Sequence, residues 1–239
     1  MRSGQLRGVI FDMDGVLVDS HAAHRKAWRL FFETLGREVP EAELDFILDG
    51  RKRGEILRHF LGERPDAEVE EFGRRKDCIF RQTQLEVAAV PGAIPLVREL
   101  HANDTALGLA TSASQSRALS TLTELGVLHC FRVVVTGEDV ALGKPDAGVY
   151  RLACQRLEIE NKYLIAVEDA VSGVRAAVAA GLRCIGVALH ETAENLRAVG
   201  AIHVVPNFGS VSAKDLEGMV LDYESGVQLS PRAAAIENG

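Results

Sequence analysis

Short apolar runs alternate with amphipathic segments along most of this chain. The apolar runs predict strands at Gly8–Phe11, Ala106–Ala110, Arg132–Val135, Tyr163–Val167, Arg183–Val187 and Ile202–Val205. The segments between them carry apolar residues at the three-to-four spacing of helices, and Gly126 and Gly181 stand where two of those helices should end. Strands that alternate with helices are joined by right-handed crossovers, so we predict an α/β fold with a doubly wound parallel sheet.

Residues 21–89 interrupt this alternation. They contain no convincing strand and show amphipathic helical segments such as "HRKAWRLFFETLG" and "RGEILRHFLG". We therefore predict an all-helical domain at 21–89, inserted into a core formed by residues 1–20 and 90–239. The alternative is a set of long helices on the surface of one core. The final stretch, "VQLSPRAAAIENG", is predicted to be a poorly ordered tail.

Charge and hydropathy exclude several classes of partner. The formal net charge of −7 argues against nucleic acid, whereas a small anionic ligand needs only a few local cations. No stretch approaches the roughly 18 apolar residues of a membrane span, and Asp12 cuts the N-terminal apolar run too early for a signal peptide. The four cysteines form no CxxC pair, so we expect reduced, buried thiols in a cytoplasmic protein. We also expect a monomer or a small homo-oligomer.

The first predicted strand runs directly into two acids, Asp12 and Asp14. In an open parallel sheet, ligands bind beyond the carboxyl ends of the strands. Two carboxylates held so close repel each other unless a cation or a proton lies between them, and Mg²⁺ prefers such oxygen ligands. An aspartate can also act as a nucleophile toward phosphorus, and Gly15 permits a tight turn near a ligand. Taken alone, this pair is equally compatible with a structural turn.

The ends of the other predicted strands carry matching chemistry. They present the hydroxyls of Thr111 and Ser112, the cation of Lys144, and the acids Glu168 and Asp169, followed by Ser172 and Gly173. Each has a plainer explanation as a helix cap or a surface charge. Caps and chance explain the whole set poorly, because four strand ends would then bring a nucleophile, a hydroxyl, a cation and metal-ligating acids to one crevice by coincidence.

Four segments, "DMDGVLVDS", "TSAS", "GKPD" and "EDAVSGVRAAVAAG", resemble the haloacid dehalogenase superfamily in this order. The resemblance spans about residues 8–206 and implies a Rossmann-like catalytic core with a helical cap, as in phosphoglycolate phosphatase and β-phosphoglucomutase. It implies that Asp12 is the nucleophile and Asp14 the general acid/base. It further implies that Ser112 binds the transferring phosphoryl oxygens and that Lys144 pairs with the phosphate and the nucleophile.

The resemblance also implies a Mg²⁺ cofactor. Asp12, Glu168, Asp169 and the main-chain carbonyl of Asp14 would hold the ion. Mg²⁺ and Lys144 would offset the negative charge that otherwise keeps Asp12 away from a phosphate. The dehalogenase branch of the superfamily lacks the acid/base aspartate and needs no Mg²⁺, so dehalogenation is not expected here.

The cap residues bear on the substrate. The segment "DSHAAHRKAW" is similar to the hinge of β-phosphoglucomutase, and the likeness assigns its substrate-contacting histidine to His24 and not to His21. The same likeness assigns substrate binding to further positions, which are Gly15, Gly50, Arg53, Lys76 and Ser114. From the pattern alone, His24 could equally be a packed histidine, and Arg53 and Lys76 would more often be solvated charges.

Two positions bear on whether the activity is that of a hydrolase or of a mutase. Asp49 stands where the mutase has a lysine, and an acid there should lower the positive potential beside Arg53 and Lys76. Val16, in place of the threonine of phosphoglycolate phosphatases, points back to the mutase. We predict a Mg²⁺-dependent hydrolase of small phosphate monoesters, acting on a small phosphorylated metabolite through an aspartyl-phosphate, with a sugar-phosphate mutase as the alternative. A non-catalytic phosphate-ester sensor is the remote alternative, because a fold does not guarantee chemistry.

Overall fold

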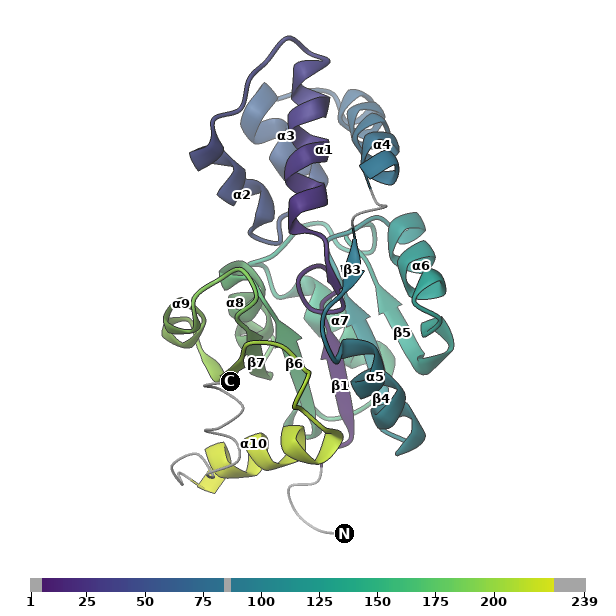
Figure 1. Cartoon of the computed structure of the whole chain (residues 1–239), viewed down its shortest axis with the longest axis vertical. Coiled ribbons are helices and arrows are strands. Elements are labelled where there is room, and N and C mark those ends of the chain that lie inside the picture. The colour runs from purple at the N-terminus through teal and green to yellow at the C-terminus, as the bar shows by residue number, and fades with distance from the viewer. Residues whose placement is uncertain (1–5, 84–86, 226–239) are drawn as a thin grey trace.

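Six parallel strands form the central sheet of the computed structural model, which describes residues 6–83 and 87–225. The strands lie in the order β5-β4-β1-β6-β7-β8 (Figure 1). Their bounds are Gly8–Phe11 (β1), Ala106–Ala110 (β4), Phe131–Val135 (β5), Leu164–Glu168 (β6), Arg183–Val187 (β7) and Ala201–Val205 (β8). The predicted doubly wound α/β sheet is confirmed, and each predicted strand agrees with the structure to within one residue at either end.

The strand β1 lies in the interior of the sheet because apolar residues cover both of its faces. Its side chains alternate, so that Val9 and Phe11 pack into one hydrophobic cluster and Ile10 into the other. Gly8 pairs with Ala106 of β4 on one side and with Leu164 of β6 on the other. This register places the residue after β1, Asp12, between the carboxyl ends of β4 and β6.

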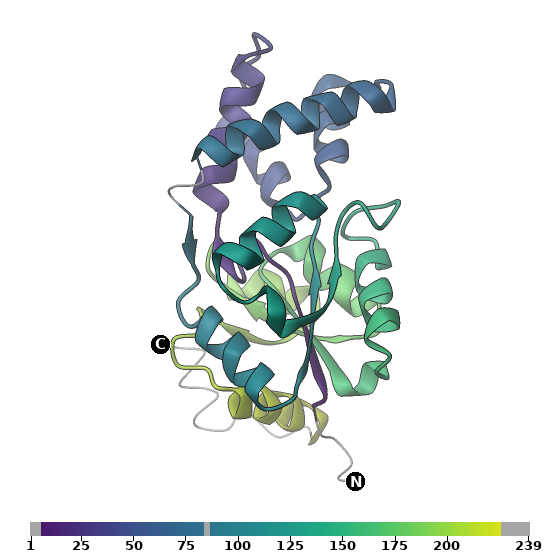
Figure 2. The same cartoon turned by 90° about the vertical axis from the view of Figure 1, so that its right-hand side faces the viewer.

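Helices cover both faces of the sheet (Figures 1 and 2). The helices that contribute to the cluster of Val9 and Phe11 are α5 (Ala93–Ala102), α6 (Gln115–Glu124) and α10 (Ala213–Ser225). Those that contribute to the cluster of Ile10 are α7 (Gly148–Leu157), α8 (Val171–Ala179) and α9 (Ala193–Ala198). Single 3-10 turns precede β5 and β6, at Leu128–Cys130 and Asn161–Tyr163. Gly126 and Gly181 follow α6 and α8 with positive φ, as predicted for helix ends.

The inserted segment forms a helical cap over the carboxyl end of the sheet (Figures 1 and 2). It consists of α1 (His21–Glu33), a 3-10 turn (Glu41–Glu43), α2 (Leu44–Leu48), α3 (Arg53–Leu61) and α4 (Asp66–Thr83). The cap has its own hydrophobic cluster, built around the buried rings of Trp28, Phe31, Phe32 and Phe60. This separate core confirms an inserted helical unit and disfavours a set of surface helices on one core.

The two connections between cap and core lie side by side. Val18–Asp19 (β2) pairs antiparallel with Ala88–Ala89 (β3), which forms a two-stranded hinge. The strand β3 falls within the range expected to be wholly helical, and the boundary at residue 89 stays a prediction. The predicted C-terminal tail lies outside the described residues.

Two further expectations concern cysteines and membranes. All four cysteines are free thiols, but only three are buried, so the expectation of burial is wrong for Cys78, which lies exposed on α4. Among the described residues, no helix is both long and apolar enough to cross a membrane.

Candidate active site

The predicted residues converge on a cavity between cap and core with an empty volume of about 680 Å³, mouth included. The described residues that line it include ten of the predicted ones, namely Asp12, Asp14, His24, Gly50, Arg53, Lys76, Ser112, Ser114, Lys144 and Asp169. Two predicted residues do not line the cavity. Glu168 lies behind Lys144, and Gly15 forms the turn after Asp14. The cationic and hydroxyl groups that line the cavity, Lys144, Arg117 and Ser112 among them, suit a small anionic ligand.

Lys144 joins the two acids at the strand ends. Its ammonium group donates to Asp12 Oδ1 at 2.6 Å and also to Glu168 Oε1, and its side chain is only 1% exposed. Tyr150 Oη donates to the same Glu168 oxygen at 2.8 Å. Burial alone would lower the pKa of Lys144, but the charges of Asp12 and Glu168 outweigh it and raise that pKa. Lys144 is therefore a fixed cation beside the predicted nucleophile.

Three buried carboxylates carry more negative charge than Lys144 balances. Oxygens of Asp12, Glu168 and Asp169 all lie within 4.8 Å of one another. Burial raises the pKa of all three groups, and for each of them a neighbouring carboxylate adds to the rise. Oxygen ligands, burial and excess negative charge are what a Mg²⁺ site requires, so the donor set fits this ion.

Gly15 allows this acidic group to pack closely. Its φ is +77°, and a Cβ at this position would come within 1.8 Å of Asp169 Oδ2. The backbone turn after Asp14 therefore touches a carboxylate of the β6 strand end. Any larger residue would push Asp169 away from Asp12.

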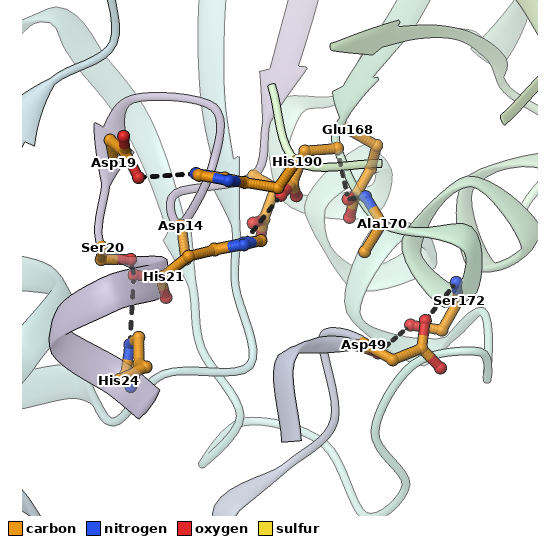
Figure 3. A network of polar contacts seen from close by, with 12 residues as sticks. Asp14, Asp19, Ser20, His21, His24, Asp49, Glu168, Ala170, Ser172 and His190 are labelled. Carbon is orange, nitrogen blue, oxygen red and sulfur yellow. Dashed lines mark hydrogen bonds and ion pairs between the residues drawn. The ribbon is translucent and has the colours of Figure 1, made fainter. Parts of the chain in front are cut away.

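Asp14 is held by groups from the cap side and from α6. The two terminal guanidinium nitrogens of Arg117, Nη1 and Nη2, donate to Oδ1 and Oδ2 of Asp14. Ser20 Oγ also donates to Oδ1. His24 Nε2 lies 3.5 Å from the same Oδ1 (Figure 3). Burial would raise the pKa of Asp14, but Arg117 outweighs it and holds that pKa well below its usual range. In this arrangement Asp14 is ionised and cannot donate a proton.

Arg117 was not foreseen from the sequence. It lies in the first turn of α6, where its backbone N–H donates to the capping hydroxyl of Ser114 at 3.4 Å. The available signal was a cation in the first turn of the helix that follows β4, at the edge of the sheet where the predicted site lies. Ser114, predicted to bind substrate, serves as this helix cap and also lies 3.4 Å from Asp77 Oδ2.

The predicted cap residues are brought together as a buried polar group. His24 Nδ1 lies 3.0 Å from Lys76 Nζ, and the ammonium lies over the rings of Trp28 and Phe80. Burial lowers the pKa of Lys76 to about 7, and burial together with the charge of Lys76 lowers the pKa of His24 to about 3. Neither residue is a solvated surface charge.

Arg53 also points inward. Its guanidinium is paired with Asp77 of α4, an acid that the sequence reasoning did not single out. A Cβ at Gly73 would come within 2.2 Å of Arg53 Nε, so this glycine makes room for the guanidinium. The cap therefore presents a cation whose charge is already partly balanced.

The loop between α2 and α3 lies directly on the core. Ser112 Oγ donates to the carbonyl of Gly50, whose φ is +64°, and a Cβ at Gly50 would be 3.5 Å from Lys144 Cδ. Glu55 of α3 accepts from the backbone N–H of Gly143 at 2.8 Å. The cap thus contacts both the hydroxyl predicted to bind phosphate and the residue that precedes Lys144.

Asp49 lies at a contact between the cap and the core. Its Oδ1 accepts from the backbone N–H of Ser172, in the first turn of α8, at 3.0 Å (Figure 3). Ser172 Oγ donates in turn to the Asp49 carbonyl. Asp49 does not line the cavity, but its other oxygen, Oδ2, lies 3.6 Å from a guanidinium nitrogen of Arg51, which does. The expectation that Asp49 lowers the positive potential beside Arg53 and Lys76 stays a prediction. An acid is favoured at a helix N-terminus, and this position fastens cap to core.

The lowered pKa of Lys76 predicts how substrate binding depends on pH. Because its pKa is about 7, its charge is present below that pH and is lost above it. If Lys76 attracts an anionic substrate, KM should rise by up to about tenfold per pH unit above neutrality. Lys76→Arg keeps its charge at every such pH and should flatten this rise. KM for one phosphorylated substrate, measured from pH 6 to 9 in both proteins, checks this, and superimposable profiles would contradict it.

The chain is similar in sequence to known proteins. The sequence matches the family described as haloacid dehalogenase-like hydrolase over residues 9–187. It is 35% identical over 182 residues to hexitol phosphatase A of Escherichia coli strain K12, covering 76% of this chain and 82% of that protein. It is 28% identical over 192 residues to the β-phosphoglucomutase of Bacillus subtilis strain 168, covering 76% of this chain and 83% of that protein.

A solved structure is similar to both the core and the cap. The crystal structure of CbbY from Rhodobacter sphaeroides, in complex with phosphate, has a TM-score of 0.80 and 27% sequence identity. The match covers 89% of this chain and all of that one. The similarity therefore includes the inserted helices as well as the sheet.

Proposed function

Because the chain belongs to the haloacid dehalogenase-like hydrolase family, we propose that it is a Mg²⁺-dependent phosphatase of small phosphate monoesters, sugar phosphates among them. The observation that carries this proposal is Asp12, held by Lys144 at 2.6 Å beside two further buried carboxylates. A carboxylate placed in this way can attack a phosphorus atom while the fixed cation balances the incoming charge. The similarity to hexitol phosphatase A supports a phosphorylated sugar or polyol as the substrate.

The first step is attack by an Asp12 oxygen on phosphorus. The P–O bond to the leaving group breaks as the Asp12–phosphorus bond forms, and an aspartyl-phosphate results. Lys144 stays beside the nucleophile, and Ser112 exchanges its bond to the Gly50 carbonyl for one to a phosphoryl oxygen. Phosphoryl transfer depends chiefly on such positioning and on charge neutralisation.

Asp14 moves the protons in both steps. It protonates the leaving alkoxide and then takes a proton from the water that hydrolyses the aspartyl-phosphate. Because the two bonds from Arg117 keep Asp14 ionised, Arg117 has to leave it when substrate enters. Asp14 then takes up a proton from solvent, and this is the proton that it gives to the leaving alkoxide. The sugar hydroxyls or the phosphate of the substrate are suitable new partners for this guanidinium.

Mg²⁺ would be held by Asp12, Asp169 and the carbonyl of Asp14, where it would neutralise phosphoryl charge. Glu168 uses one oxygen for Lys144 and Tyr150, and its other oxygen accepts from the backbone N–H of Asp169 at 3.1 Å. Its role is therefore to orient Lys144 and to add negative charge behind the ion.

A sugar-phosphate mutase is the second candidate. It is favoured by the 28% identity to β-phosphoglucomutase and by His24, which lies beside Asp14 as the hinge resemblance implied. The prediction that Asp49 lowers the positive potential beside Arg53 and Lys76 argues against it. We prefer the phosphatase because the identity to hexitol phosphatase A is higher and because Arg53 is already paired with Asp77.

Product analysis separates these functions. The protein is supplied with Mg²⁺ and, in turn, with hexitol phosphates, hexose phosphates, phosphoglycolate and β-glucose 1-phosphate. Free phosphate and glucose 6-phosphate are both measured. We expect phosphate release from at least one sugar or polyol phosphate and little glucose 6-phosphate. Efficient isomerisation with almost no free phosphate would establish the mutase, and binding without either product would favour a sensor.

A further inference from the structure

Two histidines connect the hinge to the acidic cluster. His21 Nε2 lies 3.1 Å from Asp169 Oδ2, and the His21 ring stacks on that of His190 with centroids 4.1 Å apart. His190 Nε2 in turn lies 2.7 Å from Asp19 Oδ1 (Figure 3). The sequence considered His21 only to exclude it as the substrate contact and gave no reason to consider His190, and the proposed reaction uses neither.

The four residues come from different parts of the chain. Asp19 belongs to the hinge strand β2, and His21 is the first residue of the cap helix α1. His190 lies in the loop after β7, and Asp169 follows β6 at the edge of the site. Each histidine therefore links a residue at the hinge or at the start of the cap to the core.

We propose that His21 is a positioning residue for Asp169, which fixes the orientation of this carboxylate toward a divalent cation. The inference rests on the proposed Mg²⁺ site. Oδ2 is hydrogen-bonded to His21 and lies against the Gly15 turn, so one oxygen of the carboxylate is held in place and Oδ1 is left for a cation. Partners that orient a metal-binding carboxylate commonly change metal affinity 10- to 100-fold.

His190 supports His21 from the other side. The stacked rings, 21° from parallel, limit rotation of the His21 side chain, and Asp19 holds His190 in place. His21 begins the cap while Asp169 sits on the core, so this contact joins the two parts of the molecule.

The test is calorimetric titration of the whole protein with Mg²⁺, and with Mn²⁺ as a tighter probe, without substrate. His21→Phe keeps a ring for stacking but has no N–H, and should weaken cation binding 10- to 100-fold. His21→Gln places an amide N–H near the same point and should restore affinity to within about threefold of the natural protein. His190→Phe keeps the ring stack on His21 but loses the contact with Asp19. It should weaken cation binding less than His21→Phe does.

The matched control is His59→Phe, which changes a histidine that stacks on Phe46 far from the acids and should not alter cation affinity. Circular dichroism checks that each variant is folded, and His21→Ala replaces His21→Phe if the latter is not. Equal or tighter cation binding by a folded variant without the N–H, or failure of His21→Gln to restore binding, would overturn the role of His21. If the natural protein itself binds neither ion, the proposed Mg²⁺ site is what fails.

Discussion

Asp12→Asn is expected to lower turnover at least about 10³-fold while leaving the protein folded. Removal of a catalytic nucleophile causes losses of this size or larger in other enzymes. An amide is a poor nucleophile and a poor ligand for Mg²⁺. The fold should persist because Lys144 keeps its bond to Glu168, and because the change removes one of three crowded carboxylates. Turnover of the best phosphate ester found for the natural protein is the measurement, with thermal unfolding recorded beside it.

The matched control is Asp45→Asn, an exposed acid on α2 that pairs with Arg25 and lies outside the cavity. This variant should retain the natural rate, because an exposed ion pair contributes little to stability. Activity of Asp12→Asn above about one percent of the natural rate would remove Asp12 from the role of nucleophile, provided that deamidation is excluded by mass spectrometry.

Exhaustive treatment with EDTA should abolish turnover, and added Mg²⁺ should restore it. Oxygens of Asp12, Glu168 and Asp169 lie within 4.8 Å of one another, and their negative charge exceeds what Lys144 balances. Without a divalent cation, this charge repels an incoming phosphate dianion. Phosphate release, followed as Mg²⁺ is removed and returned, measures the effect.

Thermal unfolding gives a second, independent measurement of the same site. An ion that binds only the folded protein raises its stability, by about 2.7 kcal/mol at a hundredfold excess over Kd. We therefore expect Mg²⁺ to raise the Tm of the natural protein, and to raise it less after Asp169→Asn. Undiminished turnover after complete chelation, with no effect of Mg²⁺ on Tm, would contradict a metal-dependent mechanism.

The sequence by itself determined the sheet and the residues at its carboxyl edge. Strands such as Gly8–Phe11 are short apolar runs, and the acids that follow them are adjacent in sequence, so both can be recognised within a few residues. In a parallel sheet all strand ends face the same way, so Asp12, Thr111 and Asp169, which directly follow β1, β4 and β6, had to share one crevice. The cap was predictable for the same local reason, since only helical spacing fills residues 21–83.

Only the tertiary structure decided which polar partners these residues have. Arg117 and Asp14 are 103 residues apart, and Asp49 and Ser172 are 123 apart. Nothing in the local sequence around these four residues predicts the two pairs. The Asp49–Ser172 and His21–Asp169 contacts depend on where the cap lies relative to the core. The Arg117–Asp14 contact lies within the core and depends on how α6 packs beside the end of β1.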